Sequence, residues 1–381
     1  MDRARRLAVL ISFSGAGGVE RMVMNLLPAF LQAGLAVDLL AILRKPAPEL
    51  IRLNGSGMRV LDLGVTHTAL AVPGLVRYLK TERPFALLAA KDRAIRAAVL
   101  AKRLSRVDTR LVGRLGTHLS AAMANKPALI RWARQWPMRD VYSAVDRIVA
   151  VSEGVAEDTR RIARLPPEKI AVIRNPVITP EMLEKSRMPP DHPWFESSDI
   201  PVILGAGRLT RQKDFSTLIR AFARVRAVIN SRLVILGEGR LRPGLEKLAA
   251  DLGIADDISL PGHVANPYAY MARSSLFALS SAWEGSPNVL TEALALGTPV
   301  VSTDCPSGPR EILQDGRYGP LVPVGDAERL ADAMLNTLQS PLANGFLREA
   351  AAEYTLERSA ARYLEMLGFA PSGSTNILHI A

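Results

Sequence analysis

The chain has 381 residues, of which 48% are hydrophobic and 22% are charged, and its formal net charge at pH 7 is +11. This composition is typical of a globular protein of about two domains and excludes disordered and fibrous chains. The single cysteine, Cys305, excludes an intramolecular disulfide framework and favours a reducing compartment. No segment has the roughly 20 consecutive apolar residues that span a bilayer, and the first residues do not form a signal-peptide pattern, so we expect a cytoplasmic protein.

The charge is divided unevenly along the chain. Residues 1–180 contain 29 Lys and Arg against 14 Asp and Glu, whereas the remaining residues contain 19 against 23. A basic half of this kind suits nucleic acid, an anionic membrane surface or an acidic substrate. No nucleic-acid-binding signature accompanies it, so nucleic acid is the weakest of the three expectations.

The first half alternates short apolar runs with helical patterns. The run LAVLISF at 7–13 predicts a buried strand, and after a glycine turn the apolar residues of 19–31 recur at helical spacing until Gly34. Further strand-like runs lie at 37–43, 86–90, 110–116, 147–152 and 169–173. This alternation predicts a parallel sheet that is covered by helices on both faces.

The alternation breaks at 174–201, which is rich in proline and polar residues and is the expected linker. It then restarts, with strand-like runs at 202–207, 233–239, 258–262, 275–281 and 299–304 and helical patterns at 215–229, near 244–252 and after Pro287. We therefore predict two doubly wound α/β domains, 1–178 and 179–355. Because open parallel sheets bind ligands at the carboxyl ends of their strands, two facing sheets predict a ligand in an interdomain cleft.

The first candidate site follows the first strand, in SFSGAGGVER. Gly15, Gly17 and Gly18 lie between a strand and a helix, where glycines leave backbone amides open to an anion. The alternative is a tight turn with no ligand. The spacing differs from the G-x-G-x-x-G fingerprint, which disfavours an NAD-dependent dehydrogenase.

The second candidate site follows the strand at 202–207. Arg208 and Lys213 lie between that strand and the next helix, and two cations there could clamp a diphosphate. The alternative is that both are solvated surface charges.

The third candidate site is SAWEGSPNVLTEALALGTPVVST at 281–303. Ser286 is a good N-cap and Pro287 a good first helical residue. The amides of Asn288 and Val289 are then expected to lack intrahelical partners and to bind a phosphate.

Two carboxylates, Glu284 and Glu292, flank this expected phosphate site. Carboxylates accept hydrogen bonds from hydroxyls, so a ligand with both phosphate and sugar hydroxyls satisfies the whole cluster. The alternative is that acidic residues favour helix starts through the helix dipole, which explains one glutamate better than two.

Together these motifs resemble glycosyltransferase family 4, the retaining nucleotide-sugar enzymes with two facing Rossmann-like domains, known as the GT-B fold. The resemblance covers nearly the whole chain and rests on GGVER, GRLTRQKDFSTLIRAF, LVILGEG and EGSPNVLTEALALGTPVVSTDCPSGPREIL, in which Glu284 and Glu292 form the family's paired-glutamate element. It implies a helix within 356–381 that crosses back to the first domain. It also implies a nucleotide-sugar donor, with UDP favoured, and neither a cofactor nor a metal.

The resemblance implies a role for each motif. Arg208 and Lys213 would bind the donor diphosphate, Glu292 the ribose hydroxyls and Glu284 the donor sugar hydroxyls. The diphosphate would also rest on backbone amides, those after Ser286 at Asn288 and Val289 and those of the loop with Gly15, Gly17 and Gly18.

Two further positions come from the resemblance alone. His118, in RLGTHLS, matches the family's histidine near the donor sugar, so Arg208, Lys213, Glu284 and His118 form the implied catalytic set. The loop with Gly262, His263 and Val264 matches one that contacts the base through its backbone.

The implied chemistry is transfer with retention of anomeric configuration. The acceptor hydroxyl attacks from the face of the departing diphosphate, which takes its proton, while the protein positions the groups and stabilises the leaving charge. A nucleotide-sugar epimerase on the same architecture and a non-catalytic nucleotide-sugar-binding protein are the alternatives.

The basic first half is the family's acceptor side, which suggests a glycan or lipid-linked acceptor of surface polysaccharide or lipopolysaccharide synthesis at the inner membrane face. In KPALIRWARQWPMRD at 126–140, Trp132 and Trp136 share a helical face, with Arg131, Arg134 and Arg139 nearby, which suits an anionic bilayer interface. The open alternative is a helix that packs both tryptophans into the core. The oligomeric state is not legible from the sequence.

Overall fold

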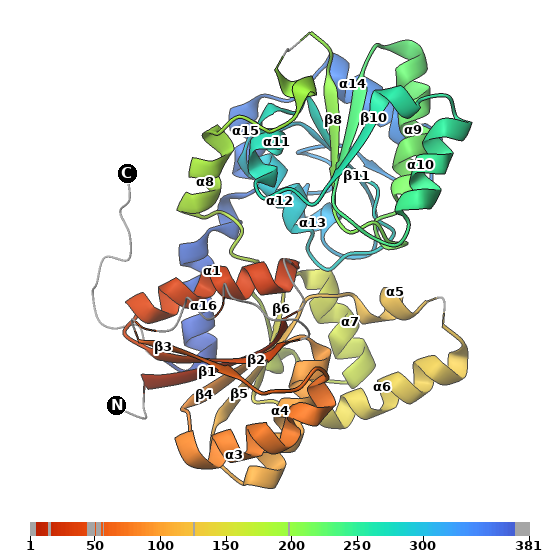
Figure 1. The fold of residues 1–381 in the computed structure, drawn as a ribbon. Helices are drawn as coiled ribbons and strands as arrows, with labels where there is room; N and C mark the ends of the chain where they lie inside the picture. The colour runs from red at the N-terminus through yellow and green to blue at the C-terminus, as the bar shows by residue number, and fades with distance from the viewer. Residues whose placement is uncertain are drawn as a thin grey trace. The chain divides into compact units, whose positions relative to one another are not determined.

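The computed structural model describes residues 5–13, 17–43, 50, 55, 57–124, 126–196 and 199–369, and the chain forms two compact units (Figure 1). Unit 1 is Met1–Pro176 together with the segment that starts at Leu356, and unit 2 is Val177–Thr355. The chain therefore passes from unit 1 to unit 2 after Pro176 and returns after Thr355.

Unit 1 is built on a seven-stranded parallel sheet with the strand order β3-β2-β1-β4-β5-β6-β7. The strands are β1 (Arg6–Phe13), β2 (Ala36–Leu43), β3 (Met58–Asp62), β4 (Ala86–Ala90), β5 (Arg110–Leu115), β6 (Arg147–Ala150) and β7 (Ile170–Val172). Their apolar residues are buried on both faces, as a parallel sheet between helices requires. The strand order reverses between β1 and β4, so the switch point of this sheet lies at their carboxyl ends.

Helices cover both faces of the unit 1 sheet. One apolar core packs the sheet against α3 (Val72–Glu82), α4 (Asp92–Ser105), α5 (Leu119–Met123), α6 (Ala128–Ser143) and α7 (Glu153–Ala163). The other packs it against α1 (Gly18–Gln32) and α16 (Leu356–Leu367). In Figure 1 the blue α16 lies beside the red α1. A helix from late in the chain therefore completes the core of unit 1 on this face of the sheet.

Unit 2 repeats the plan with a six-stranded parallel sheet of order β10-β9-β8-β11-β12-β13. Its strands are β8 (Val202–Ala206), β9 (Arg232–Leu236), β10 (Ile258–Gly262), β11 (Leu276–Leu279), β12 (Val300–Thr303) and β13 (Leu321–Val322). The switch point of this sheet lies between β8 and β11.

The helices of unit 2 also form two cores. One face of the sheet packs against α8 (Pro180–Arg187), α11 (Pro267–Arg273), α12 (Asn288–Ala295), α13 (Pro309–Ile312) and α15 (Asn344–Glu349). The other face packs against α9 (Phe215–Val228), α10 (Arg242–Asp251) and α14 (Ala327–Gln339). The predicted α/β class with two doubly wound parallel sheets is confirmed.

The expected linker at 174–201 includes the passage from unit 1 to unit 2 after Pro176, but it also contains α8, which the sequence did not indicate. The side chain of Thr179 accepts a hydrogen bond from the amide of Met182 and caps this helix, and Pro180 is its first residue. The proline-rich composition that suggested a linker therefore includes a helix start, where proline is tolerated because its missing N–H has no helical partner.

Hydrogen bonds hold the chain close to both crossings. In unit 1 the amide of Asn25 donates to the Pro176 carbonyl at 2.8 Å, and the Ser359 hydroxyl donates to the Arg174 carbonyl at 2.9 Å. In unit 2 the amides of Val177 and Ile178 both donate to the carbonyl of Tyr354. Within the described ranges, no helix combines the length and the apolar character that crossing a bilayer would need.

Candidate functional site

The residues expected to bind the donor gather at the carboxyl edge of the unit 2 sheet. Arg208 and Lys213 lie in the loop between β8 and α9, and Glu284 lies in the loop between β11 and α12. Because β8 and β11 are the adjacent strands at the switch point, both loops leave the sheet at the place where α/β sheets bind ligands.

Lys213 and Glu284 form an ion pair across these two loops. The Lys213 Nζ lies 2.6 Å from the Glu284 Oε1, and the two side chains are 15% and 9% exposed. The same oxygen accepts a hydrogen bond from the Ser281 hydroxyl at 2.7 Å, and the Gln212 amide lies 3.4 Å from the other oxygen. Three donors thus fix one carboxylate, an arrangement that offsets the cost of burying its charge.

Hydrogen bonds to backbone carbonyls connect the two loops. The Ser280 hydroxyl donates to the Lys213 carbonyl at 2.8 Å, and the Ala282 amide donates to the Gln212 carbonyl at 2.8 Å. The Gln212 side-chain amide donates to the Trp283 carbonyl at 3.0 Å. The positions of Lys213 and Glu284 are therefore set by the scaffold as well as by their mutual attraction.

Two glycines of the sequence motifs are required by close packing around this loop. Gly207 has a φ of +152°, and a Cβ there would lie 2.8 Å from the Cε of Lys213. Gly237, in LVILGEG, has a φ of +132°, and a Cβ there would lie 2.1 Å from the Gly207 carbonyl oxygen. The loops after β8 and β9 therefore stack backbone to backbone, and the glycine at 237 makes this approach possible.

Arg208 is exposed and forms no ion pair with any residue that the structure describes. Its guanidinium is the second cation of this loop, and it can turn to a ligand without breaking an internal contact. The Cys305 thiol, in the loop after β12, lies near the same charges. Burial, with the Glu284 charge as a second cause, raises its pKa to about 12, so Cys305 stays protonated.

The helix that follows Glu284 starts one residue later than predicted. The sequence indicated Ser286 as the N-cap and Pro287 as the first helical residue, whereas Pro287 occupies the N-cap and α12 starts at Asn288. No side chain caps the helix. The loop after β12 packs tightly against this helix start, because a Cβ on Gly308 would lie 2.6 Å from the Pro287 Cδ.

Asn288 and Val289 are the first two residues of α12, and the first intrahelical backbone bond is donated by Leu290. Glu292 is the fifth residue of the helix and is fully buried. The predicted amides and the second glutamate thus belong to one short helix, next to the Glu284 loop.

The loop after β10 joins the same edge. Gly262 accepts a hydrogen bond from the Gly237 amide at 2.7 Å, which ties the loop after β10 to the loop after β9. His263, which follows, is exposed, and Val264 is half-buried against the unit 2 core. Within the described ranges, the His263 imidazole forms no hydrogen bond or ion pair that would give it a specific role.

His118 belongs to unit 1, where it caps α5. Its Nδ1 accepts a hydrogen bond from the Ala121 amide at 3.2 Å and lies 3.3 Å from an oxygen of Asp158. Both contacts involve Nδ1, so Nε2 is the ring nitrogen that they leave open to a ligand. The Asp158 carboxylate also accepts from the Ser120 amide at 3.0 Å, which fixes the start of α5.

The glycine loop of unit 1 is described only in part. Gly15 lies outside the described residues, Gly17 is the N-cap of α1 and Gly18 is its first residue. A Cβ on Gly17 would lie 2.4 Å from a carboxylate oxygen of Glu20, so this position has no room for a side chain. Glu20 and its partner Lys91, an ion pair with a distance of 2.8 Å, were not anticipated from the sequence.

The tryptophans of the segment at 126–140 lie on the surface. Trp132 and Trp136, on α6, are 60% and 70% exposed and stack with ring centroids 6.1 Å apart. The alternative that they pack into the core is therefore wrong. Leu129 and Ile130 on the same helix are exposed as well. Arg131 and Arg139 are exposed, and the side chain of Arg134 lies outside the described residues.

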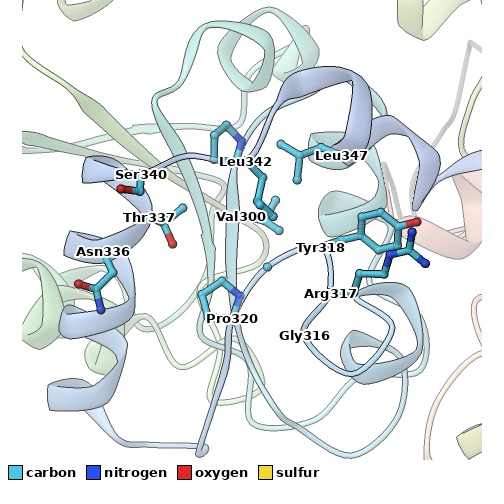
Figure 2. Close-up of a pocket in the computed structure, with 12 residues that line it drawn as sticks. Val300, Gly316, Arg317, Tyr318, Pro320, Asn336, Thr337, Ser340, Leu342 and Leu347 are labelled. Carbon is cyan, nitrogen blue, oxygen red and sulfur yellow. The ribbon is translucent and has the colours of Figure 1, made fainter.

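A cavity of about 390 Å³ lies elsewhere in unit 2 (Figure 2). Figure 2 shows Thr337 of α14 and Ser340, which caps the end of α14, on one side of it and Tyr318 and Leu347 on the other. Val300, the first residue of β12, lines the cavity. The cavity therefore lies at the amino edge of the sheet, opposite the edge that carries the Lys213 and Glu284 loops. It holds none of the predicted site residues. No three metal-binding side chains come together within the part of the chain that the structure describes.

Comparisons with known proteins decide the family. The model of Glycosyltransferase Family 4 matches residues 16–180, and that of Glycosyl transferases group 1 matches residues 200–340. A Campylobacter jejuni enzyme, N-acetylgalactosamine-N,N'-diacetylbacillosaminyl-diphospho-undecaprenol 4-alpha-N-acetylgalactosaminyltransferase, is 31% identical over 91% of this chain and 92% of its own. The chain belongs to glycosyltransferase family 4. The lipopolysaccharide core biosynthesis glycosyltransferase LpsE of Rhizobium meliloti is 30% identical over 94% of this family 4 chain and 98% of its own.

Solved structures share the fold of this family 4 glycosyltransferase. Anabaena HepE, crystallised with UDP and glucose, superposes with a TM-score of 0.76 at 18% identity, over 96% of this chain and 99% of its own. WaaG, a glycosyltransferase involved in lipopolysaccharide biosynthesis, superposes with a TM-score of 0.73 at 16% identity, over 97% and 100%. The predicted GT-B fold class is confirmed.

Proposed function

We propose that this glycosyltransferase moves a sugar from a UDP-sugar to a glycan or lipid-linked acceptor in cell-surface polysaccharide or lipopolysaccharide synthesis, with retention of anomeric configuration. The observation that carries the proposal is the buried Lys213–Glu284 pair at the switch point of the unit 2 sheet, with Arg208 in the same loop as Lys213 and without an ion pair among the described residues. The relatives named for lipopolysaccharide and lipid-diphosphate substrates, and the UDP bound in the HepE structure, support the substrate classes.

The donor diphosphate is assigned to Arg208, Lys213 and the start of α12. An ammonium has three N–H donors, and Glu284 takes one of those on Lys213, which leaves two for phosphate oxygens. Arg208 adds a planar fork that suits two phosphate oxygens at once. Both cations would act mainly on the charge that develops on the leaving diphosphate.

The hydroxyls of the donor are assigned to the two glutamates. Glu284 Oε1 already accepts from Lys213 and Ser281, so its Oε2, with only a long contact to Gln212, is the oxygen assigned to a sugar hydroxyl. Glu292 is assigned to the ribose and His118 to the sugar through its Nε2. The remaining amide contacts are assigned to Gly17 and Gly18, with Gly15, and to the backbone of His263 and Val264 for the base.

The transfer step is assigned to attack on the same face as the departing diphosphate. The acceptor oxygen forms the new glycosidic bond as the bond to the diphosphate breaks, and the diphosphate takes the hydroxyl proton. In this scheme the protein supplies position and charge and needs no general base. NMR of the product anomeric centre tests the stereochemistry, and an inverted product would remove the retaining assignment.

The acceptor is assigned to unit 1, and contact with the membrane to α6. The first half of the chain has the excess of basic residues, and α6 exposes Trp132 and Trp136 with Arg131 and Arg139 beside them. Tryptophan and arginine together suit the headgroup region of an anionic bilayer. This arrangement would hold the enzyme where a lipid-linked acceptor is available.

Ligand stabilisation tests the donor proposal directly. The melting temperature of the full chain would be measured in the presence of a UDP-, a GDP- or an ADP-sugar. A ligand at 100 times its dissociation constant adds roughly 2.7 kcal/mol to the unfolding free energy. We expect a UDP-sugar to raise the melting temperature most. A GDP- or ADP-sugar with the largest effect would correct the base, and no effect from any of the three would overturn the donor site.

A further inference from the structure

A second charged cluster lies at the carboxyl edge of the unit 1 sheet, and none of the roles assigned above uses it. Its centre is Lys91, which joins the end of β4 to the start of α4. The Lys91 Nζ donates to the Ser12 carbonyl at the end of β1, at 3.3 Å, and to the Glu20 carboxylate at 2.8 Å. Because β1 and β4 flank the switch point, Lys91 occupies the position where such sheets bind ligands.

The structure holds Lys91 in an unusual conformation. Its φ is +88°, a value that residues with a side chain rarely adopt, and its amide is fixed by the Arg114 carbonyl at 3.1 Å. Two acceptors hold the ammonium, and its third N–H has no acceptor among the described residues. With 34% of the side chain exposed, that N–H is open to a ligand.

Glu20 keeps the ammonium in this place. It is the glutamate of GGVER, its side chain is 4% exposed, and one of its oxygens lies against Gly17. A carboxylate this buried does not reach a ligand itself. Its contact with Lys91 instead orients the cation and balances its charge, so Glu20 is a positioning residue.

A second cation lies behind the first. Arg114, in β5, is buried and donates to the Asn175 side-chain oxygen at 2.8 Å, while its Nε and Nη1 have no partner among the described residues. Burial lowers the pKa of Arg114, and Tyr363 and then Glu20 act in the opposite direction. Arg114 therefore adds a second, buried positive charge to this edge of the sheet, which favours an anion there.

We propose that Lys91 binds a phosphoryl group of a substrate, with Glu20 holding its ammonium in position. The proposal rests on the proposed function, in which the donor carries a diphosphate and an anionic acceptor carries phosphoryl groups. Lys91 acts on such a group as a point charge and a single N–H donor, which is how lysine commonly meets phosphate.

Calorimetric titration of the full chain with inorganic phosphate tests the proposal. We expect Lys91→Met to weaken phosphate binding at least tenfold, and Lys91→Arg, which keeps the charge, to stay within about threefold of wild type. Lys80→Met is the matched control, because Lys80 is exposed in the last turn of α3. If Lys91→Met does not fold, Lys91→Gln serves as the second neutral variant.

Repeating the titration with saturating UDP identifies the source of the phosphoryl group. Phosphate that still binds under UDP, and is lost in Lys91→Met, points to the acceptor. If UDP displaces the phosphate, and Lys91→Met binds UDP at least tenfold more weakly than wild type does, the phosphoryl group belongs to the donor.

Two results would overturn the proposal. In the first, Lys91→Met binds both phosphate and UDP as tightly as wild type does. In the second, wild type binds no phosphate and Lys91→Met binds UDP normally. Wild type that binds phosphate but not UDP would instead count against the donor site of unit 2.

Glu20→Ala and Glu20→Gln test the positioning role. Glu20→Ala removes the acceptor that holds the Lys91 ammonium, so phosphate should bind more weakly than to wild type, whereas Glu20→Gln keeps an acceptor oxygen and should stay closer to wild type. Phosphate affinity that is unchanged in Glu20→Ala would contradict the positioning role.

Discussion

Lys213 and Glu284 meet at 2.6 Å between the loops that follow β8 and β11, and both side chains are largely buried. The pair joins a basic motif and an acidic motif that are 71 residues apart in the sequence. Because Ser281 and Gln212 also donate to Glu284, the carboxylate is fixed before any ligand arrives. A preorganised cation loses less free energy on binding a phosphate than one that must be ordered first.

Removal of the Lys213 ammonium should slow turnover. We expect Lys213→Ala to lower kcat at least about tenfold, since even 1.4 kcal/mol of transition-state stabilisation is worth that factor. Initial rates at saturating UDP-sugar measure it. The control is Lys247→Ala on α10, whose exposed ammonium pairs only with Asp251 at the surface. Lys213→Ala with unchanged turnover would remove the leaving-group role from this residue.

Lys213→Ala also leaves the Glu284 carboxylate without its cation. A buried charge that loses its partner destabilises the fold, so the melting temperature should fall in Lys213→Ala and recover in the double variant with Glu284→Gln. Rates are therefore compared well below the lower melting temperature.

The two glutamates should fail in different ways. Glu292→Ala should weaken binding of UDP itself, because the ribose belongs to the nucleotide. Glu284→Gln should leave UDP affinity close to wild type and weaken the intact UDP-sugar at least about tenfold, the loss expected when a charged hydrogen-bond partner is removed. Calorimetry with UDP and with the UDP-sugar measures both. Equal losses for both ligands in both variants would undo the division of roles.

Most of the fold was legible from the sequence because its strands are buried. The run ALLAA at 86–90 matches β4 in full, since a parallel strand covered on both faces is nearly all apolar. The run ISLPG at 258–262 matches the bounds of β10, an edge strand that is only partly buried. β3 and β13 were missed. Met58–Asp62 is a half-exposed edge strand and Leu321–Val322 has only two residues, so neither gives a continuous apolar run.

The sequence predicted the site only where a single motif contains both the functional residues and the strand that precedes them. Arg208, Lys213 and Glu284 follow strands, and topology brings those strands together. The Lys91–Glu20 pair gave no such signal, because the two residues are 71 positions apart and either alone is typical of a surface charge. The tight packing of Gly308 against Pro287 at the start of α12 is a contact between two loops, which no local pattern records.

The stacking of the loops after β8 and β9 predicts a large effect from one methyl group. Gly237→Ala places a Cβ about 2.1 Å from the Gly207 carbonyl oxygen at a φ of +132°, so it should cost at least about 2 kcal/mol of unfolding free energy. Gly244→Ala is the control, because a Cβ there, in α10, meets no atom within 4 Å and should be neutral or stabilise by up to about 1 kcal/mol. Urea titration compares them, and equal midpoints would contradict the packing.

The Cys305 thiol should be inert in the folded protein. It is buried, and its pKa is raised to about 12, so almost no thiolate exists at pH 8. An aromatic disulfide reagent should label it at least a hundredfold more slowly than in the unfolded chain. The raised pKa also predicts that the fold loses stability as the pH rises above about 9, where the unfolded thiol ionises and the folded one does not. Cys305→Ala should show less of this loss, and rapid labelling of the native chain would contradict the burial.

Membrane contact through α6 predicts a binding curve that depends on both charge and aromatic residues. Wild type should sediment with vesicles that contain anionic lipid and far less with neutral ones, and raising the salt from about 0.05 to 0.5 M should release it, because screening weakens contacts between basic residues and the surface. Trp132→Ala with Trp136→Ala should reduce binding at low salt at least about tenfold, since two exposed indoles leave the interface. Leu70→Ala is the control, because Leu70 is similarly exposed but lies outside α6. If the double variant bound as tightly as wild type, α6 would not be the docking helix, and equal binding to neutral vesicles would remove the electrostatic part of the proposal.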